Sequence, residues 1–200
     1  MDGTIKFAII SKALSMFNIE IAKEDIEETE NIKHEVALSL MWLDSAYSRS
    51  VHSFKWEFLT EPIEFERIEL ENISTSYGFI YAYKITDERE IVDISKIIQN
   101  HDYHKQPQFR KNKKIIYTNA RDIEIFAIIK PDMEELKEIA PIEFIDLISY
   151  QLAILIAPAL APKDTAIQQL IASQYNLVNN TLMREETVGQ MKRFSNEEVD

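Results

Sequence analysis

The chain contains no cysteine and only three glycines among its 200 residues. Without cysteine it forms no disulfide, carries no thiol nucleophile and has no cysteine-based metal site. Three glycines are too few for a glycine-rich phosphate loop, and neither a Walker A sequence nor a dinucleotide-binding fingerprint is present. The absences therefore exclude thiol chemistry and the commonest modes of nucleotide binding.

Basic residues are also scarce, because 22 Lys and Arg face 34 Asp and Glu, which gives a formal net charge of −12. An acidic surface repels the phosphate backbone, so we expect no tight wrapping of nucleic acid, although DNA can pass nearby without being held. The first ten residues carry an acid and too short an apolar run for a secretory signal peptide. A hydrophobic content of 46% is enough for the core of one domain, with or without a sizeable insertion.

The most apolar stretch of the sequence runs from Ile142 to Ala161. Between Leu147 and Ile156, apolar residues cover nearly every side of a helical wheel, which predicts a central helix surrounded by other helices. Pro158 and Pro162 are expected to kink or end it. The uncharged run from Leu147 to Ala161 is too short for the hydrocarbon core of a bilayer, so no membrane span is expected.

Other segments show the period of amphipathic helices. The pattern predicts helices over Thr4–Phe17 and Ile32–Phe54, and a last helix that begins after the N-cap Asp164 and ends at about Glu186. A short acidic helix is expected after Pro131.

The middle of the chain favours strands. Residues 77–85, rich in aromatic and β-branched side chains, predict a strand, and residues 91–98 fit a strand or a short helix. Residues 101–114 are predicted to form a polar, basic loop. Residues 114–118 and 123–129 look like two strands joined by four turn-forming residues, which predicts a hairpin.

These elements predict an α+β fold that is mainly α. A helical bundle is expected from residues 1–58 and 130–186, with a small β-rich insertion, residues 59–129, between the second and third main helices. Residues 187–200 are polar, contain Gly189 and lose the apolar period. They are predicted to form a flexible C-terminal tail that orders on a partner.

Two groups of residues resemble catalytic or metal-binding sets. His101 and His104 lie three residues apart, but no third ligand has matching spacing, so a solvated loop is favoured over a metal site. Ser45, Ser48 and Ser50 with His52 suggest a nucleophile and a base, but they lie along one predicted helix without the strand–turn–helix elbow that exposes a nucleophilic serine. We therefore predict no catalytic residue, no metal site and no cofactor, and expect that the chain is not an enzyme.

One cluster of basic residues interrupts the acidic sequence. Such a cluster can contact phosphate or an acidic protein surface, or it can be a solvated loop tip, and the sequence leaves both readings open. Its members are Lys105, Arg110, Lys111, Lys113 and Lys114.

A set of aromatic residues precedes this cluster. Along a strand, the four between residues 77 and 83 point to one face, which either packs on the helices or supplies a surface between subunits. Both uses are compatible if the insertion lies at a subunit boundary. The set consists of Trp56, Phe58, Tyr77, Phe79, Tyr81 and Tyr83.

The order of several short motifs resembles a known family. In sequence order they are Ala46-Tyr47 and Arg49, Trp56-Glu57-Phe58, residues 77–83 (YGFIYAY), residues 114–119 (KIIYTN), Pro131-Asp132, residues 152–158 (LAILIAP) and Tyr175. Over residues 4–185 this series resembles the tail tubular protein A family, the head-to-tail adaptors of short-tailed phages. Lys84-Ile85-Thr86-Asp87 stands where that family has Leu-Pro-x-Asp, so the proline is missing here.

The resemblance implies a helical-bundle core with a β-rich insertion and no catalysis. It also implies a ring, usually of twelve subunits, between the portal protein and the tail nozzle or hub, through which DNA passes without specific binding. The protein would then belong to the virion and would be in the host cytoplasm during assembly, without a membrane partner.

The resemblance also suggests where the partners bind. The tail is the candidate for portal docking, with Met191, Arg193 and Phe194 as anchors. The aromatic and basic sets are candidates for subunit or tail-side contacts. The residues alone also allow an acidic helical binding module or regulator that acts through the basic loop at residues 101–114.

Overall fold

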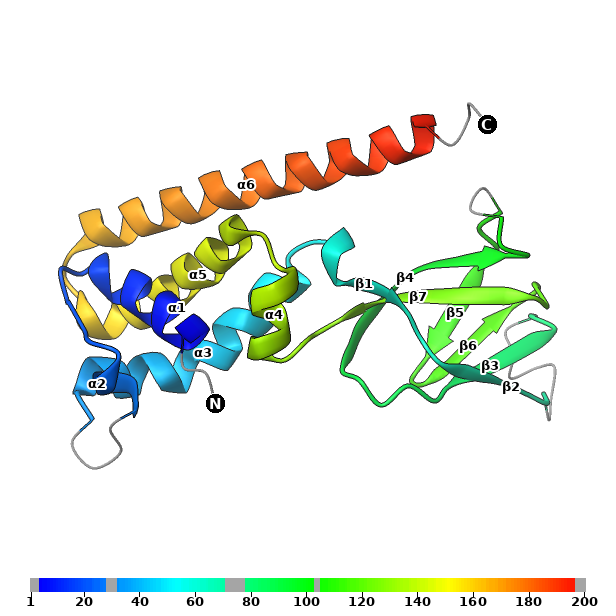
Figure 1. The fold of residues 1–200 in the computed structure, drawn as a ribbon, viewed down its shortest axis with the longest axis horizontal. Helices are drawn as coiled ribbons and strands as arrows, with labels where there is room; N and C mark the ends of the chain where they lie inside the picture. The colour runs from blue at the N-terminus through cyan, green and yellow to red at the C-terminus, as the bar shows by residue number, and fades with distance from the viewer. Residues whose placement is uncertain (1–3, 28–31, 71–77, 103–104, 197–200) are drawn as a thin grey trace. The chain divides into compact units, whose positions relative to one another are not determined.

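The computed structural model of the chain describes residues 4–27, 32–70, 78–102 and 105–196, with side chains as far as Thr187. The chain divides into two compact units, which we call the helical unit (residues 1–54 and 132–200) and the β unit (residues 55–131). The sequence predicts these boundaries after residues 58 and 129, whereas the structure has them after residues 54 and 131. Figure 1 shows the elements of both units.

The helical unit is built around one apolar helix. Helix α5 contacts α1, α3 and α6, and Leu147, Leu152 and Ile156 on it are fully buried. The predicted central position of this helix is therefore confirmed (Figure 1). The helices are α1 (Thr4–Ser15), α2 (Glu24–Glu27), α3 (His34–His52), α4 (Met133–Ile139), α5 (Ile142–Leu160) and α6 (Thr165–Asn196).

By length and composition alone, α5 is long and apolar enough to cross a membrane. Half of its most apolar window is buried inside the structure, however, and the core helix of a soluble protein passes the same test. The apolar character of α5 is thus accounted for by the three helices that pack on it.

The last helix starts as predicted and ends later. Asp164 accepts a hydrogen bond from the backbone N–H of Ile167 at 3.0 Å, which is the interaction of an N-cap. Helix α6 continues to Asn196, so the predicted helix end near Glu186 is wrong. The apolar period shows only which part of a helix packs against other elements. Beyond Glu186 the sequence still contains good helix formers such as Met, Arg and Gln, so the helix continues without that packing signal.

The β unit contains two antiparallel sheets. The strand order is β1-β7-β4 in the three-stranded sheet and β2-β3-β6-β5 in the four-stranded sheet. A short 3-10 helix, η1 (Glu57–Leu59), precedes them. The strands are β1 (Thr60–Pro62), β2 (Phe65–Ile68), β3 (Tyr81–Ile85), β4 (Ile91–Gln99), β5 (Phe109–Asn112), β6 (Ile115–Thr118) and β7 (Ile123–Ile129).

Side chains from both sheets meet in one core. The four-stranded sheet contributes residues such as Tyr83 and Ile116, and the three-stranded sheet contributes residues such as Ile97 and Ile125. The complete buried cluster is Ile63, Tyr83, Ile85, Ile94, Ile97, Ile116, Ile125, Ala127 and Ile129. The β unit therefore has a hydrophobic core of its own.

The predicted fold class is wrong in one respect. The chain is α+β, with about 51% helix and 22% strand, but its β part is not a small insertion in a helical bundle. It is a second compact unit with two sheets. Strands β1, β2 and β5 escaped prediction because they are three or four residues long and consist largely of charged residues and proline, so they lack the alternation that marks a strand.

The predicted hairpin between residues 114–118 and 123–129 is also wrong. Strand β6 pairs with β3 and β5, whereas β7 pairs with β1 and β4, so the two runs belong to different sheets. The intervening residues 119–122 carry the chain from one sheet to the other. Alternation of apolar residues is the same in a hairpin and in two facing sheets, and only the tertiary structure separates these arrangements.

Candidate functional site

The aromatic strand of the β unit is a core element on one face. Tyr83 on β3 is buried, and its ring lies 5.6 Å from that of Phe65 on β2 in an edge-to-face arrangement. The residues packed on this face come from the opposing sheet, not from the helices as the sequence suggested. Half-buried Tyr81 lies on the same face, with the guanidinium of Arg67 4.9 Å from its ring centroid.

The hydroxyl of Tyr83 holds the connection between β6 and β7, where the chain passes from one sheet to the other. It donates to the backbone carbonyls of Ala120, at 3.1 Å, and of Arg121. A phenol is protonated at neutral pH, and burial raises the pKa of Tyr83 further, so the hydroxyl is a donor. A buried side chain thus holds the turn that carries Arg121 and Asp122.

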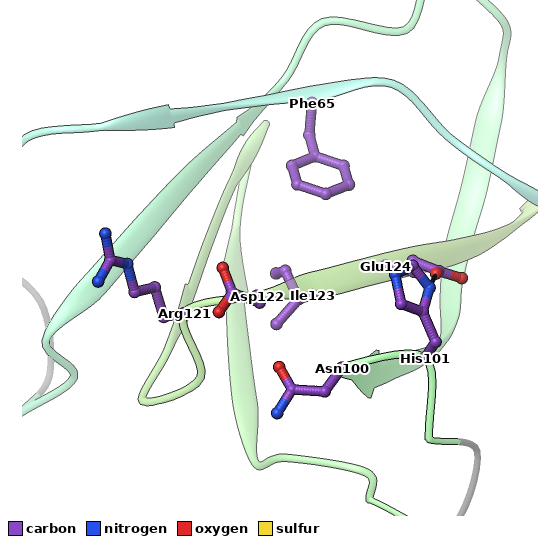
Figure 2. A pocket seen from close by; sticks show the side chains of 7 residues that line it. All are labelled: Phe65, Asn100, His101, Arg121, Asp122, Ile123 and Glu124. Carbon is purple, nitrogen blue, oxygen red and sulfur yellow. Dashed lines mark ion pairs between the residues drawn. The ribbon is translucent and has the colours of Figure 1, made fainter.

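Beside this turn lies an open hollow of about 260 Å³. Figure 2 shows Phe65 on one side of it, His101 and Glu124 next to each other, and Arg121 projecting away. The full lining is Phe65, Asn100, His101, Arg121, Asp122, Ile123 and Glu124, all from the β unit.

Backbone geometry places the histidine of this hollow. Asn100 and His101 have φ of 54° and 58°, and the N–H of Asp102 donates to the carbonyl of Gln99 at 3.0 Å. Two positive φ angles at the central positions are typical of a type I′ turn, in which asparagine is favoured. The turn directs Nδ1 of His101 to a carboxylate oxygen of Glu124, with which it forms an ion pair when the ring is protonated.

The side chains that line the hollow are suited to binding a ligand more than to reacting with one. Its lining holds a histidine, two carboxylates and a guanidinium, but no hydroxyl or thiol side chain that His101 could activate as a nucleophile. Within the described part of the chain, no three His, Asp or Glu side chains are placed to bind one metal ion. A small polar or charged group is the ligand chemistry that fits this lining.

A second polar arrangement ties two connections of the β unit together. Asp87, after β3, is buried and accepts hydrogen bonds from the backbone N–H groups of Glu64 and Arg89. The Arg89 guanidinium also binds it at two points and holds the pKa of that carboxyl far below its usual range. Arg89 contacts Glu61 and the carbonyl of Pro62 as well. These contacts link the β3–β4 connection to β1.

The basic cluster lies mostly on a hairpin, not on a loop as predicted. Strands β5 and β6 pair from Phe109↔Thr118 to Asn112↔Ile115, which leaves Lys113 and Lys114 as a two-residue turn. Lys113 has a φ of 54°, the left-handed region that such tight turns require. All four residues of β5 are exposed, and so are both turn lysines.

The remaining predicted site residues lie apart. Trp56 is fully buried, and the ring of half-buried Phe58 lies 6.0 Å from it. Phe79 is half-buried just before β3, whereas Tyr77 lies outside the described residues. Lys105 forms an ion pair with Asp102 at 3.2 Å.

The C-terminal anchors and the serine set both belong to the helical unit. Met191, Arg193 and Phe194 lie within the span of α6, but their side chains are outside the described part. On α3, Nδ1 of His52 lies 2.6 Å from the carbonyl of Ser48, so its ring is engaged with the backbone of its own helix.

Sequence reasoning missed the hollow and the Asp87–Arg89 pair. Residues 100–101 and 121–124 are separated by about twenty positions and meet only because β4 and β7 pair. Asn100 after an apolar run was the available signal for a turn, since asparagine tolerates the left-handed region. No family model matches the chain, and no curated protein shows significant similarity to its sequence.

Proposed function

We propose that this chain is a structural protein of a phage virion, a head-to-tail adaptor. Its copies form a ring, with twelve as the expected number, between the portal protein and the tail nozzle or hub. DNA passes through the central channel without specific binding. The proposal includes no catalytic step and no cofactor, and it places the protein in the virion after assembly in the host cytoplasm.

The observation that carries the proposal is the ordered series of motifs from Ala46 to Tyr175, together with the role of Asp87, which follows the aromatic motif. The family's aromatic strand motif ends in an Asp, and here Asp87 follows the aromatic strand β3. Asp87 is buried and anchors the connection between β3 and β4. The proline of the family motif is absent here, but the Asp that ends the motif is present as Asp87. Its anchoring role supports the resemblance even where the sequence departs from the motif.

The charge of the chain supports the same function. A net charge of −12 disfavours lasting contact with DNA, as a channel wall requires. A ring built by head-to-tail contacts needs two different surfaces on each subunit. The helical and β units differ in architecture and can supply such surfaces.

Electron microscopy of the protein mixed with the portal protein of the same genome tests the proposal. We expect rings stacked on one end of the portal, whether the isolated protein is a monomer or already a ring. In a second arm, Arg193→Glu with Phe194→Ala should abolish docking, and Leu170→Ala, at an exposed site, should leave it intact. A protein that stays monomeric and never joins the portal would contradict the function.

A second candidate function follows from the exposed basic hairpin. In that alternative the chain is an acidic helical binding module or regulator that uses residues 101–114. It predicts a soluble one-to-one complex with its partner and indifference to the portal protein, so the same mixing experiment separates the two functions.

A further inference from the structure

The basic hairpin is the most distinctive exposed surface of the β unit. We define it as residues 109–114, which comprise β5 and the two-residue turn. β5 is an edge strand of its sheet and pairs with β6 alone among the described strands. Lys111, Lys113 and Lys114 are exposed, and no acid of the described residues lies in ion-pair contact with them. Phe109, 37% exposed, adds an apolar anchor beside these charges.

The two units of the chain differ sharply in charge. Residues 55–131 contain 12 basic and 13 acidic residues of the chain's 22 and 34, a formal charge of −1. The helical unit holds the remaining 10 basic and 21 acidic residues, a formal charge of −11. The acidity of the protein is therefore carried almost entirely by the helical unit, and a basic surface of the β unit is electrostatically complementary to it.

One place on the helical unit also matches the hairpin in apolar character. At the junction of α4 and α5, Ile139 and Ile142 are 41% and 72% exposed, and the exposed acids Glu138 and Glu143 flank them. No basic residue of the described part is in ion-pair contact with either acid. We call residues 138–143 the junction patch. Acids around apolar anchors are the counterpart of lysines around Phe109.

We propose that the basic hairpin of one copy docks on the junction patch of a second copy of this chain. The two surfaces differ, so the contact is heterologous: each copy that donates its hairpin still presents its own junction patch. Contacts of this kind continue from copy to copy until a ring closes or a filament grows. The inference rests on the proposed function, because it names the pair of surfaces through which adaptor subunits would meet.

Two charge-neutralised variants test the contact. The hairpin variant carries Lys111→Gln, Lys113→Gln and Lys114→Gln, and the junction variant carries Glu138→Gln and Glu143→Gln. Sedimentation of the wild type at low salt should show a mass that rises with concentration and falls again in 0.5 M salt, because exposed charge pairs are screened. Each variant alone should associate about tenfold more weakly.

Mixing the variants provides the sharper result. The junction variant keeps its hairpin and the hairpin variant keeps its junction patch, so an equimolar mixture should form pairs and nothing larger. A mixture that stays monomeric, or variants that associate as the wild type does, would overturn the proposal. Binding of duplex DNA that is lost in the hairpin variant, with self-association unchanged, would assign the hairpin to phosphate instead and would also overturn it.

The absence of cysteine allows a direct test of proximity. Chains with Lys113→Cys and Ile142→Cys, mixed under mild oxidation, should give a disulfide-linked pair in excess of either chain alone. Met41→Cys, at a site 66% exposed on α3, serves as the control partner. Equal yields with Ile142→Cys and Met41→Cys would count against the contact, as would a Lys113→Cys, Ile142→Cys double variant that cross-links only within one chain.

The outcomes also separate this inference from the proposed function. Rings on the portal from a chain whose variants fail the mixing test would leave the adaptor role standing and overturn the contact. Pairs that form through the two surfaces in a protein that never joins the portal would establish the contact and overturn the adaptor role.

Discussion

Arg89 holds Asp87 by two parallel hydrogen bonds, with Nε 3.0 Å from Oδ1 and Nη2 2.7 Å from Oδ2. The side chain of Asp87 is buried, whereas the side chain of Arg89 is 42% exposed. Two charge-assisted bonds in this fork geometry fix orientation as well as distance. Because Asp87 also accepts from the backbone of Glu64, one side chain joins the segment after β3 to the segment between β1 and β2.

Asp87→Asn should destabilise the β unit by about 2 kcal/mol. Removing one partner of a fully buried pair costs more, but the exposed side of Arg89 remains solvated and keeps Glu61. Urea unfolding followed by Trp56 fluorescence, in a Trp42→Phe background, reports on the β unit alone. Glu61→Gln, which alters an exposed ion pair, is the control and should cost less than about 1 kcal/mol.

The same pair predicts a dependence of stability on pH. Arg89 lowers the pKa of Asp87 in the folded state, so the folded protein binds this proton less readily than the unfolded chain does. The stabilisation is complete above the unfolded pKa, near 4, and is lost as the pH falls further. The free energy of unfolding should therefore drop more steeply below about pH 4 in the wild type than in Asp87→Asn. Parallel curves would contradict this assignment.

Tyr83→Phe should cost about 1–2 kcal/mol, because the buried carbonyl of Ala120 and the part-buried carbonyl of Arg121 lose their donor. The ring itself stays packed against Phe65, so the effect isolates the hydroxyl. Thermal unfolding of the β unit measures it. Tyr81→Phe is the matched control on the same strand and should be nearly neutral, since Tyr81 is only half-buried.

Asp132→Ala should destabilise the helical unit by about 1 kcal/mol. The Asp132 carboxylate accepts from the N–H groups of Glu134 and Glu135 at 2.8 and 2.9 Å. The Asp132 N–H in turn donates to the Glu135 carboxylate, which completes a capping box. Asp132→Ser keeps an acceptor at the N-cap and should recover most of the loss. Equal stability of the Ala and Ser variants, measured by circular dichroism in urea, would contradict the cap.

Neighbouring residues on α6 should respond in opposite ways. Ile171 is 2% exposed, so Ile171→Ala should cost about 2–4 kcal/mol of stability through lost burial and the cavity left behind. Leu170 is 60% exposed, and Leu170→Ala should change stability by less than about 0.5 kcal/mol. Similar losses in both variants would show that a second surface covers α6 in solution.

The sequence by itself determined the helical unit well. Its main features are local in sequence, and the sequence therefore predicts them. They are the apolar character of Ile142–Leu160, the N-cap at Asp164 and the amphipathic period of α3. An all-round apolar helix has to be surrounded, whichever neighbours surround it. Even here the end of α6 was missed, because packing and helix formation stop at different residues.

The sequence indicated strands at β3, β6 and β7, but only the tertiary structure decided how the strands of the β unit pair. Whether β6 and β7 form a hairpin or face each other in separate sheets depends on contacts with β3 and β4, which lie far away in the chain. Contacts between distant segments also decide the exposure of the edge strand β5, the hollow beside His101 and the ion pair between Arg89 and Asp87. The physical reason is that a helix satisfies its backbone hydrogen bonds within its own segment, whereas a strand must find its partners elsewhere.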